Sequence, residues 1–289
     1  MYLLSRDIHK KDYIVSIFCA ILLICVYVFL APRIWPTIGQ DWNGTYMPAT
    51  RIMLAGGNPY TAKIQSFFSP IWVLIPLIPF SFLPDAISLK LILVLSFLAY
   101  LTLGYKLKAT PWTMTLFLLS PPVIFSIRQS NIEPFVLLGF ILPAPIGLFF
   151  ALAKPQIGIG IAIYWLIEAW RTGGIQRIIK TIAPVSIALL VNFLIYGNWI
   201  KVRQGAVVIA ASWNYSLWPW AIPVGLLLLY MAVISYKKYT AVSAGVFLSP
   251  YVPLYSWSAA LVGLLNNDIL MAVAVIVMWM VFFVKMWGI

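Results

Sequence analysis

The chain is poor in charge, and above all in negative charge. Charged residues make up 9% of its 289 residues, and only seven of them are Asp or Glu. Soluble domains carry about a quarter charged residues, so the composition excludes an ordinary soluble protein. Histidine occurs once, as His9, and cysteine twice, as Cys19 and Cys25 in one apolar run. These three side chains do not form a zinc-binding pattern, so we expect neither a metal nor another cofactor.

Hydrophobic residues are abundant instead, at 63% of the chain, and the mean hydropathy is +0.98. The apolar runs are continuous and do not alternate, which favours helices over barrel strands. A bilayer core about 30 Å thick takes about 20 helical residues per crossing. The sequence therefore predicts an all-α polytopic membrane protein with roughly ten transmembrane helices (about eight to twelve) in a single domain over residues 1–289. The apolar segments lie at about 13–31, 67–83, 86–105, 111–127, 132–153, 156–170, 178–197, 219–236, 239–265 and 269–287.

The net charge of +12 comes from 19 Lys and Arg that are scattered between the apolar runs. This distribution is typical of cytoplasmic loops and lipid headgroup contacts, and it argues against a nucleic-acid partner. The basic tail ahead of 13–31 predicts a cytoplasmic N-terminus and a retained anchor instead of a signal peptide. Crossing parity then places the loops 32–67 and 198–220 on the extracytoplasmic side. Prolines interrupt 67–83 and 132–153, and broken helices at membrane depth are tolerated where they line a cavity.

In the first outer loop, residues 45–55 predict a short amphipathic helix on the membrane surface. Arg51 can reach headgroups, and Gly56-Gly57 would end the helix. Its apolar residues can face lipid: Met47, Ile52, Met53 and Leu54. Asp41 lies just ahead of this helix. It either caps the helix or acts as a general base at the membrane–water boundary, where partial desolvation raises the basicity of a carboxylate. The side chains beside it would then offer a surface to a sugar: Trp42, Asn43 and Tyr46.

Two clusters of polar residues interrupt later apolar runs. Residues 128–133 are either a short loop in which Arg128 pairs with Glu133, or a site in which the amides of Gln129 and Asn131 bind hydroxyls or phosphate and Arg128 neutralises an anion. The second cluster is Lys154-Pro155-Gln156. A lysine facing lipid at mid-membrane costs about 2.5–3.5 kcal/mol. Lys154 therefore either reaches a surface from a corner between two short helices or faces a cavity; we favour an ammonium that binds a phosphate there, with Pro155 breaking the helix.

The outer loop 198–220 combines positive charge with aromatic and hydrogen-bonding side chains. Lys201 and Arg203 supply the charge, while an interfacial aromatic belt explains some of its tryptophans without any function. The remaining polar and aromatic residues that could contact a ligand here are Trp213, Asn214, Tyr215, Ser216, Trp218 and Trp220.

Taken in order, these clusters resemble the integral-membrane glycosyltransferases of the GT-C superfamily. They are most similar to family 87, the polyprenyl-phosphate-mannose-dependent mannosyltransferases. That family carries an Asp in the first outer loop, matched by Asp41, followed by a segment similar to Leu54–Tyr60. Further matches are Phe67–Pro70, Gln129 with Asn131, Lys154-Pro155, Asn214–Leu217 and Ser249–Tyr251. The resemblance covers about residues 39–256, although Arg128 replaces a glycine of the family pattern.

The resemblance implies a GT-C-like bundle that transfers a sugar, mannose in the family, from a polyprenyl-phosphate donor to a hydroxyl of a glycolipid or glycan acceptor. Asp41 would be the base of an inverting, metal-independent displacement. The donor phosphate would meet Lys154, Arg128, Arg203, Gln129 and Asn131. The sugar and acceptor would contact Trp42, Asn43, Tyr46, Asn58, Tyr60, Gln156, Asn214, Ser216 and Tyr251.

One departure from the family pattern leaves other functions open. The family often places His after the Ser-Pro corner, where this chain has Val252–Trp257 and no histidine. The role of that imidazole is then absent or passes to Tyr251, Tyr255 or Ser256. The alternatives to an enzyme are a flippase or transporter for lipid-linked sugars, which also uses broken helices and buried cations, and a catalytically inactive subunit of this superfamily.

Overall fold

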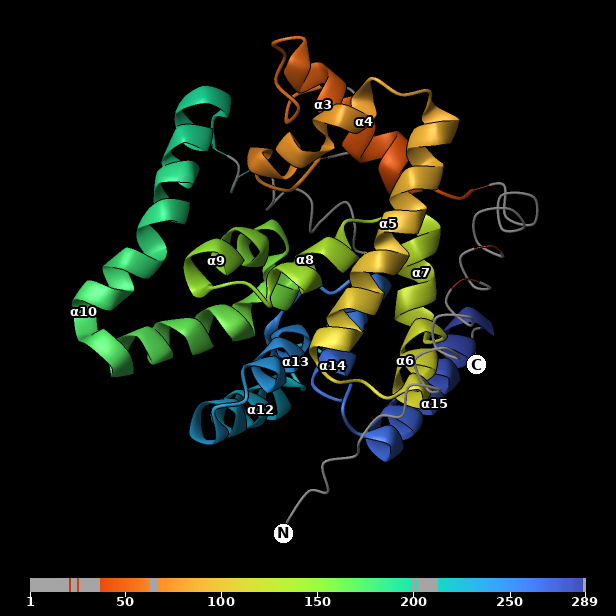
Figure 1. The fold of residues 1–289 in the computed structure, drawn as a ribbon, viewed down its shortest axis with the longest axis vertical. Coiled ribbons are helices and arrows are strands. Elements are labelled where there is room, and N and C mark those ends of the chain that lie inside the picture. Colours follow the sequence, from red (N-terminus) through yellow and green to blue (C-terminus); the bar gives the residue numbers. More distant parts are fainter. Residues whose placement is uncertain are drawn as a thin grey trace.

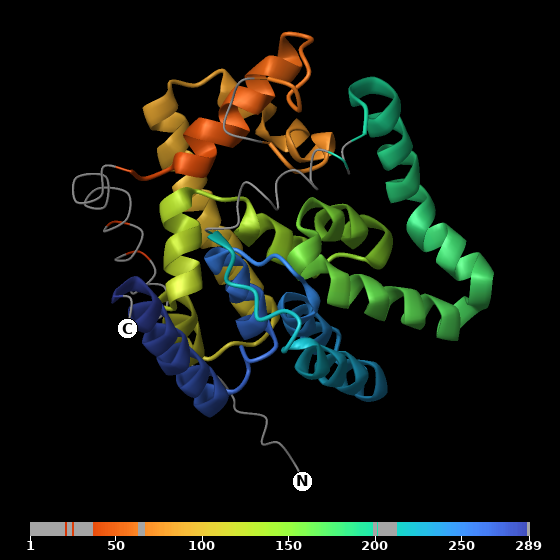
Figure 2. The ribbon, with the colours of Figure 1, turned by 180° about the vertical axis from the view of Figure 1, so that it is seen from behind.

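The computed structural model describes residues 37–62, 67–198, 201 and 213–287, together with 21 and 25. Every regular element within these residues is a helix, as Figures 1 and 2 show, so the all-α prediction is confirmed. The predicted anchor at 13–31 lies almost entirely outside the described residues, and Arg203 lies outside them as well. The helices are η2 (Trp42–Tyr46), α3 (Met47–Leu54), η3 (Ile71–Val73), η4 (Ile75–Leu77), α4 (Ile78–Ser81), α5 (Asp85–Lys106), α6 (Pro111–Leu118), α7 (Pro121–Gln129), α8 (Glu133–Gly139), α9 (Ala144–Ala153), α10 (Pro155–Tyr196), α12 (Ile222–Ser235), α13 (Lys238–Leu248), η6 (Leu254–Trp257), α14 (Ser258–Val262) and α15 (Asp268–Trp287).

Two of the described helices, α5 and α10, are long and apolar enough to cross a membrane. The ten predicted crossings are not confirmed, because several predicted segments are divided into short helices. Pro70, Pro76 and Pro79 divide 67–83 into η3, η4 and α4. The segment 132–153 divides into α8 and α9, with Pro143 at the start of α9. Each break follows from proline, which lacks the N–H that a helix interior needs.

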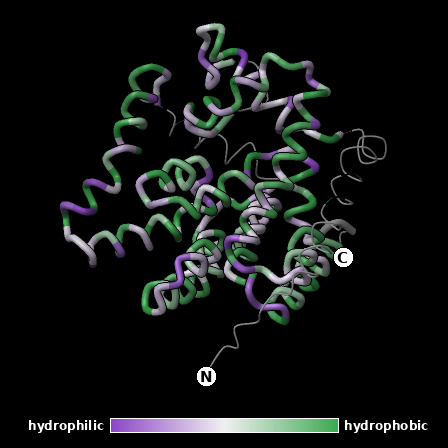
Figure 3. Tube along the Cα trace, viewed as in Figure 1, coloured by the Kyte–Doolittle hydropathy of each residue, from purple (hydrophilic) through white to green (hydrophobic). Residues whose placement is uncertain are grey.

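The outward face of α5 is rich in apolar side chains, while its buried face combines polar and apolar ones. The buried face carries Ser88, Ser96 and Tyr100 beside apolar side chains such as Phe97, each at most 1% exposed. Its outward face carries Ile87, Leu91, Leu95 and Leu98. Figure 3 shows the same bias more widely, since the helices are mainly hydrophobic in colour and hydrophilic residues gather at turns and helix ends. An apolar outer surface of this extent is expected of a protein that contacts lipid or a partner.

α10 is bent into two arms (Figure 1), which replace the loop that we predicted between 156–170 and 178–197. At the bend, Gly173 and Gly174 leave the helical conformation, and Gly174 has a φ of +56° that favours glycine. The first arm packs closely against α13, because Gly160 faces the carbonyl of Ala241 at backbone distance. The second arm ends near η3, where the Asn192 side-chain carbonyl accepts the N–H of Ile71 at 2.9 Å.

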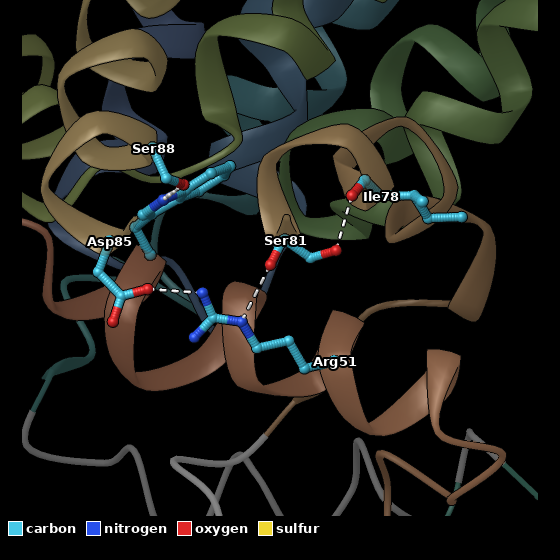
Figure 4. A network of polar contacts seen from close by, with 6 residues as sticks. Arg51, Ile78, Ser81, Asp85 and Ser88 are labelled. Carbon is cyan, nitrogen blue, oxygen red and sulfur yellow. Dashed lines mark hydrogen bonds and ion pairs between the residues drawn. The ribbon is translucent and has the colours of Figure 1, made fainter. Parts of the chain in front are cut away.

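A helix is present at the predicted position, as η2 followed by α3, and it ends where predicted. Gly56 has a φ of +76°, and the N–H of Gly57 donates to the carbonyl of Ile52 at 2.9 Å, as is common after a helix. Leu54 is exposed, but Met47 is only 2% exposed and packs into the core, so its predicted contact with lipid is wrong. Arg51 contacts protein, because its guanidinium lies 2.6 Å from a carboxylate oxygen of Asp85 and also donates to the carbonyl of Ser81. Figure 4 shows both contacts.

Candidate functional site

Asp41 begins η2 and points towards the interior. Gly39, in a left-handed conformation at φ +78°, donates its N–H to the carbonyl of Arg128 at 2.8 Å and so fixes the start of the helix against α7. The Asp41 carboxylate makes no capping hydrogen bond to its own helix, which removes the capping interpretation. It accepts a hydrogen bond from the side-chain amide of Asn131 instead. The sequence places this acid ahead of a surface helix, and the fold turns it inward.

Asn131 belongs to the corner between α7 and α8, which a single left-handed residue creates. Ser130 ends α7 with φ 51° and ψ 48°. Asn131 then bridges two acids: its amide donates to Asp41, and its side-chain carbonyl accepts the N–H of Glu133 at 3.1 Å. This predicted site residue is therefore brought to Asp41. Its neighbour Gln129 is buried, and within the described residues its side-chain carbonyl oxygen has no hydrogen-bond partner.

Glu133 and Lys154 form a buried ion pair, with 3.3 Å between the ammonium nitrogen and a carboxylate oxygen. The side chain of Glu133 is 0% exposed and that of Lys154 is 6% exposed. Lys154 lies in the corner between α9 and α10, where Pro155 starts a new helix as predicted. It faces the interior and not lipid. The pairing of Arg128 with Glu133 that the sequence left open does not occur, because the guanidinium of Arg128 donates to the hydroxyl of Thr37 at 2.9 Å.

A fourth segment, η6, closes the site with residues that follow the Ser-Pro corner. The ammonium of Lys154 lies 4.4 Å from the centre of the Tyr255 ring, a distance at which a cation and an aromatic face attract each other. The hydroxyl of Ser256 accepts the side-chain amide of Gln156 at 3.4 Å, so this predicted residue also reaches the site. Tyr255 lies within electrostatic range of Asp41, Tyr46, Tyr251 and Glu133. Two of the predicted ligand contacts, Tyr46 and Tyr251, therefore lie within electrostatic range of the Tyr255 hydroxyl.

The electrostatics of Asp41 combine burial with two stabilising neighbours. Burial raises the pKa of Asp41 above the ordinary aspartate value, while the hydrogen bond from Asn131 and the positive charge of Lys154 oppose that rise. A carboxylate that is more basic than usual, yet still stabilised in its charged form, suits a group that accepts a proton near neutral pH. Among the described residues no group of three or more His, Cys, Asp or Glu could hold a metal ion.

The structure also contains an apolar cavity of about 470 Å³. Side chains of η3, η4, α4, α5, α8 and α9 line it, together with Ile132 just before α8. Its lining includes Ile75 and Leu95, which are exposed on the outer surface, and Ile132 and Ala153, which are buried. Ile132 directly precedes Glu133, and Ala153 directly precedes Lys154. Both members of the ion pair are therefore sequence neighbours of residues in the cavity wall.

Other predicted site residues have structural contacts away from the cluster. Trp42 is 0% exposed, donates its indole N–H to Ser88 at 2.8 Å and packs on Phe80, so it offers no open face to a sugar. Asn43 is exposed. Asn58 donates to the carbonyl of Tyr196 at 3.1 Å, and the hydroxyl of Tyr60 donates to the Asn192 side chain at 3.0 Å. These contacts hold the loop after α3 to the end of α10.

The two motifs near the C-terminus hold each other. Asn214 donates to the carbonyl of Pro250 at 2.9 Å and accepts the N–H of Val252 at 3.0 Å. The hydroxyl of Ser216 donates to the carbonyl of Ser249. In this structure, therefore, Asn214 and Ser216 fix the corner that precedes Tyr255.

Sequence reasoning did not assign Glu133, Tyr255 and Ser256 to the site, although it raised each of them. The signal for Glu133 was its rarity, as one of seven acids in a very apolar chain. The signal for Tyr255 and Ser256 was their place in the stretch where the resembling family has histidine. The chain matches no family model, no curated protein sequence and no solved structure.

Proposed function

We propose that this protein is a multi-pass membrane glycosyltransferase that takes its sugar from a polyprenyl-phosphate-linked donor. The acceptor would be a hydroxyl of a glycolipid or glycan on the extracytoplasmic side, and the sugar would be mannose, as the family resemblance implies. The observation that carries the proposal is the position of Asp41 and Lys154. A base and a cation lie within electrostatic range of each other, and the cation directly follows Ala153, which lines an apolar cavity that reaches the outer surface.

Each part of the site matches one part of such a donor. The polyprenyl chain would occupy the apolar cavity and enter from the membrane past Ile75 and Leu95. The phosphate at the end of this chain would then lie next to Lys154, where an ammonium at low dielectric makes a strong charge-assisted hydrogen bond. The outward apolar face of α5 and the two candidate spans support a membrane location for this chemistry.

The reaction would be a single displacement at the anomeric carbon of the sugar. Asp41 accepts the proton of the acceptor hydroxyl, the acceptor oxygen bonds to the anomeric carbon, and the bond from that carbon to the phosphate oxygen breaks with inversion. Negative charge grows on the departing phosphate, so a fixed ammonium at Lys154 stabilises the transition state more than the ground state. Asn131 orients Asp41, and Tyr255 covers Lys154 on its other side.

The test is transfer of labelled sugar from a polyprenyl-phosphate donor by purified protein in lipid nanodiscs. Asp41→Asn is expected to lower the transfer rate by about a hundredfold or more while leaving the fold intact, because it removes the base and keeps the side-chain shape. Asp85→Asn is the matched control, since that acid lies on the surface in its pair with Arg51. Full activity in Asp41→Asn would refute the assignment of the base.

The same preparation separates the alternative functions. Movement of the donor between leaflets without any transfer would identify a flippase. Binding of the donor without transfer or movement would identify an inactive subunit.

A further inference from the structure

Lys154 is a cation between two acids. Its ammonium pairs with Glu133 at 3.3 Å and also stabilises the charge of Asp41. Within the described part of the chain it is the only buried basic residue. Arg128, five positions before Glu133, directs its guanidinium to Thr37. With all three groups ionised, the centre of the site carries a net charge of −1.

A negatively charged centre is unsuited to a phosphate. A phosphodiester adds a further charge of −1, and like charges repel strongly where the effective dielectric constant is low. In addition, an ammonium that turns towards the phosphate leaves the carboxylate it had neutralised buried and unpaired, which is costly. Binding of the anion therefore requires that one acid of the centre take up a proton.

The surroundings of the two acids indicate which one does so. Asp41 is only partly buried in the fold and keeps the hydrogen bond from Asn131, so its charge is stabilised without Lys154. Glu133 is 0% exposed. The groups that face it are the ammonium of Lys154, the hydroxyl of Ser256 and, at electrostatic range, Asp41, Tyr100 and Tyr255. Lys154 is the one cation among them, so its departure leaves Glu133 without a compensating charge.

We propose that Glu133 is a positioning residue that holds Lys154 before a ligand binds and takes up one proton when a lipid phosphodiester replaces it as the partner of the ammonium. The inference rests on the proposed function for the class of ligand only. In chemical terms, the ion pair between Glu133 and Lys154 is exchanged for an ion pair between phosphate and Lys154, and a proton from water neutralises the Glu133 carboxylate. Proton uptake is then linked to donor binding.

The experiment measures binding without any transfer. The probe is a polyprenyl methyl phosphodiester, which stays a monoanion because it lacks the second phosphate ionisation near pH 6. Its Kd is measured in nanodiscs from about pH 6 to about pH 9. For the wild type we expect the affinity to fall as the pH rises, by up to about tenfold per pH unit. For Glu133→Gln we expect an affinity that does not change with pH and exceeds that of the wild type at the alkaline end.

Three controls decide between explanations. Asp41→Asn should keep the wild-type slope; if it flattens the profile and Glu133→Gln does not, the proton goes to Asp41 and the proposal is wrong. Lys154→Met should abolish binding at every pH. Calorimetry on the wild type in two buffers of different ionisation enthalpy should report uptake of about one proton per ligand. That measurement tests the proposal even where Glu133→Gln fails to fold, and an uptake of zero would overturn it.

This result is independent of sugar transfer. A pH-linked affinity without transfer would refute the glycosyltransferase proposal alone. Transfer with a flat binding profile in the wild type would refute the role of Glu133 alone.

Discussion

The stability of the buried pair gives the most direct test of the site geometry. Replacing Lys154 by Met keeps the length and apolar stem of the side chain and removes its charge. Glu133, which is 0% exposed, then lies unpaired in the interior. Removal of one partner of a buried ion pair typically costs about 3–5 kcal/mol. For a chain of this size, about 2–4 °C of Tm corresponds to 1 kcal/mol, so we expect Lys154→Met to lower the Tm by about 6–20 °C.

The assay is thermal unfolding of detergent-solubilised protein followed by tryptophan fluorescence, and the ranking of variants carries the information. Glu133→Gln should cost less than Lys154→Met, because Lys154 keeps Asp41 and the Tyr255 ring as neighbours. The double variant Lys154→Met with Glu133→Gln should recover part of the loss, since it leaves no buried charge unpaired. A Tm for Lys154→Met within a degree or two of the wild type would refute the reasoning, as would a double variant less stable than both single ones.

Three other variants probe the rest of the site. Asn131→Leu removes the hydrogen bond that favours ionised Asp41, so the pKa of Asp41 rises further. Because the base acts only when it is ionised, the acidic limb of the rate–pH profile for sugar transfer should move to higher pH. Trp42→Phe leaves the buried Ser88 hydroxyl without its donor and should lower stability by about 1–3 kcal/mol in denaturant titrations, with no change in KM for the acceptor. Val136→Phe fills part of the apolar cavity and should weaken binding of a long-chain polyprenyl phosphodiester by about tenfold, with a smaller effect on a short-chain analogue.

Each of these expectations has a contrary result. An unchanged acidic limb in Asn131→Leu would mean that Asp41 is not the titrating base. A raised acceptor KM in Trp42→Phe at normal stability would restore the predicted sugar contact. Equal losses for long and short tails in Val136→Phe would mean that the lipid lies elsewhere.

Local sequence signals predicted the elements that hold the site. Proline at 155 ends α9 and begins α10, and Gly56-Gly57 ends α3, because both residues act through their own backbone. The bend in α10 was harder to predict, because the break in helical conformation is confined to Gly173 and Gly174 and is shorter than the loop expected between 156–170 and 178–197. The predicted number of membrane crossings, about ten, also exceeds the two described helices that are long enough to span a membrane. Apolar character alone does not distinguish one span from several short helices.

The partners within the site were not predictable from local signals. Glu133 pairs with Lys154, 21 positions further along, and not with Arg128, five positions before it. Sequence proximity favoured Arg128 as the partner. The left-handed Ser130, however, turns the chain between the two residues, so that Arg128 bonds to Thr37 and Glu133 pairs with Lys154. Likewise, the inward position of Asp41 depends on the contact of Gly39 with Arg128, which only the folded chain creates.

The second arm of α10 is tied to the loop after α3 and to η3 by side chains near its far end. Asn58 donates to the carbonyl of Tyr196, and the single side-chain oxygen of the buried Asn192 accepts from both Ile71 and Tyr60. One amide oxygen thus joins two successive segments of the chain to the arm. Loss of the Asn192 side chain would therefore remove both of these cross-links at once.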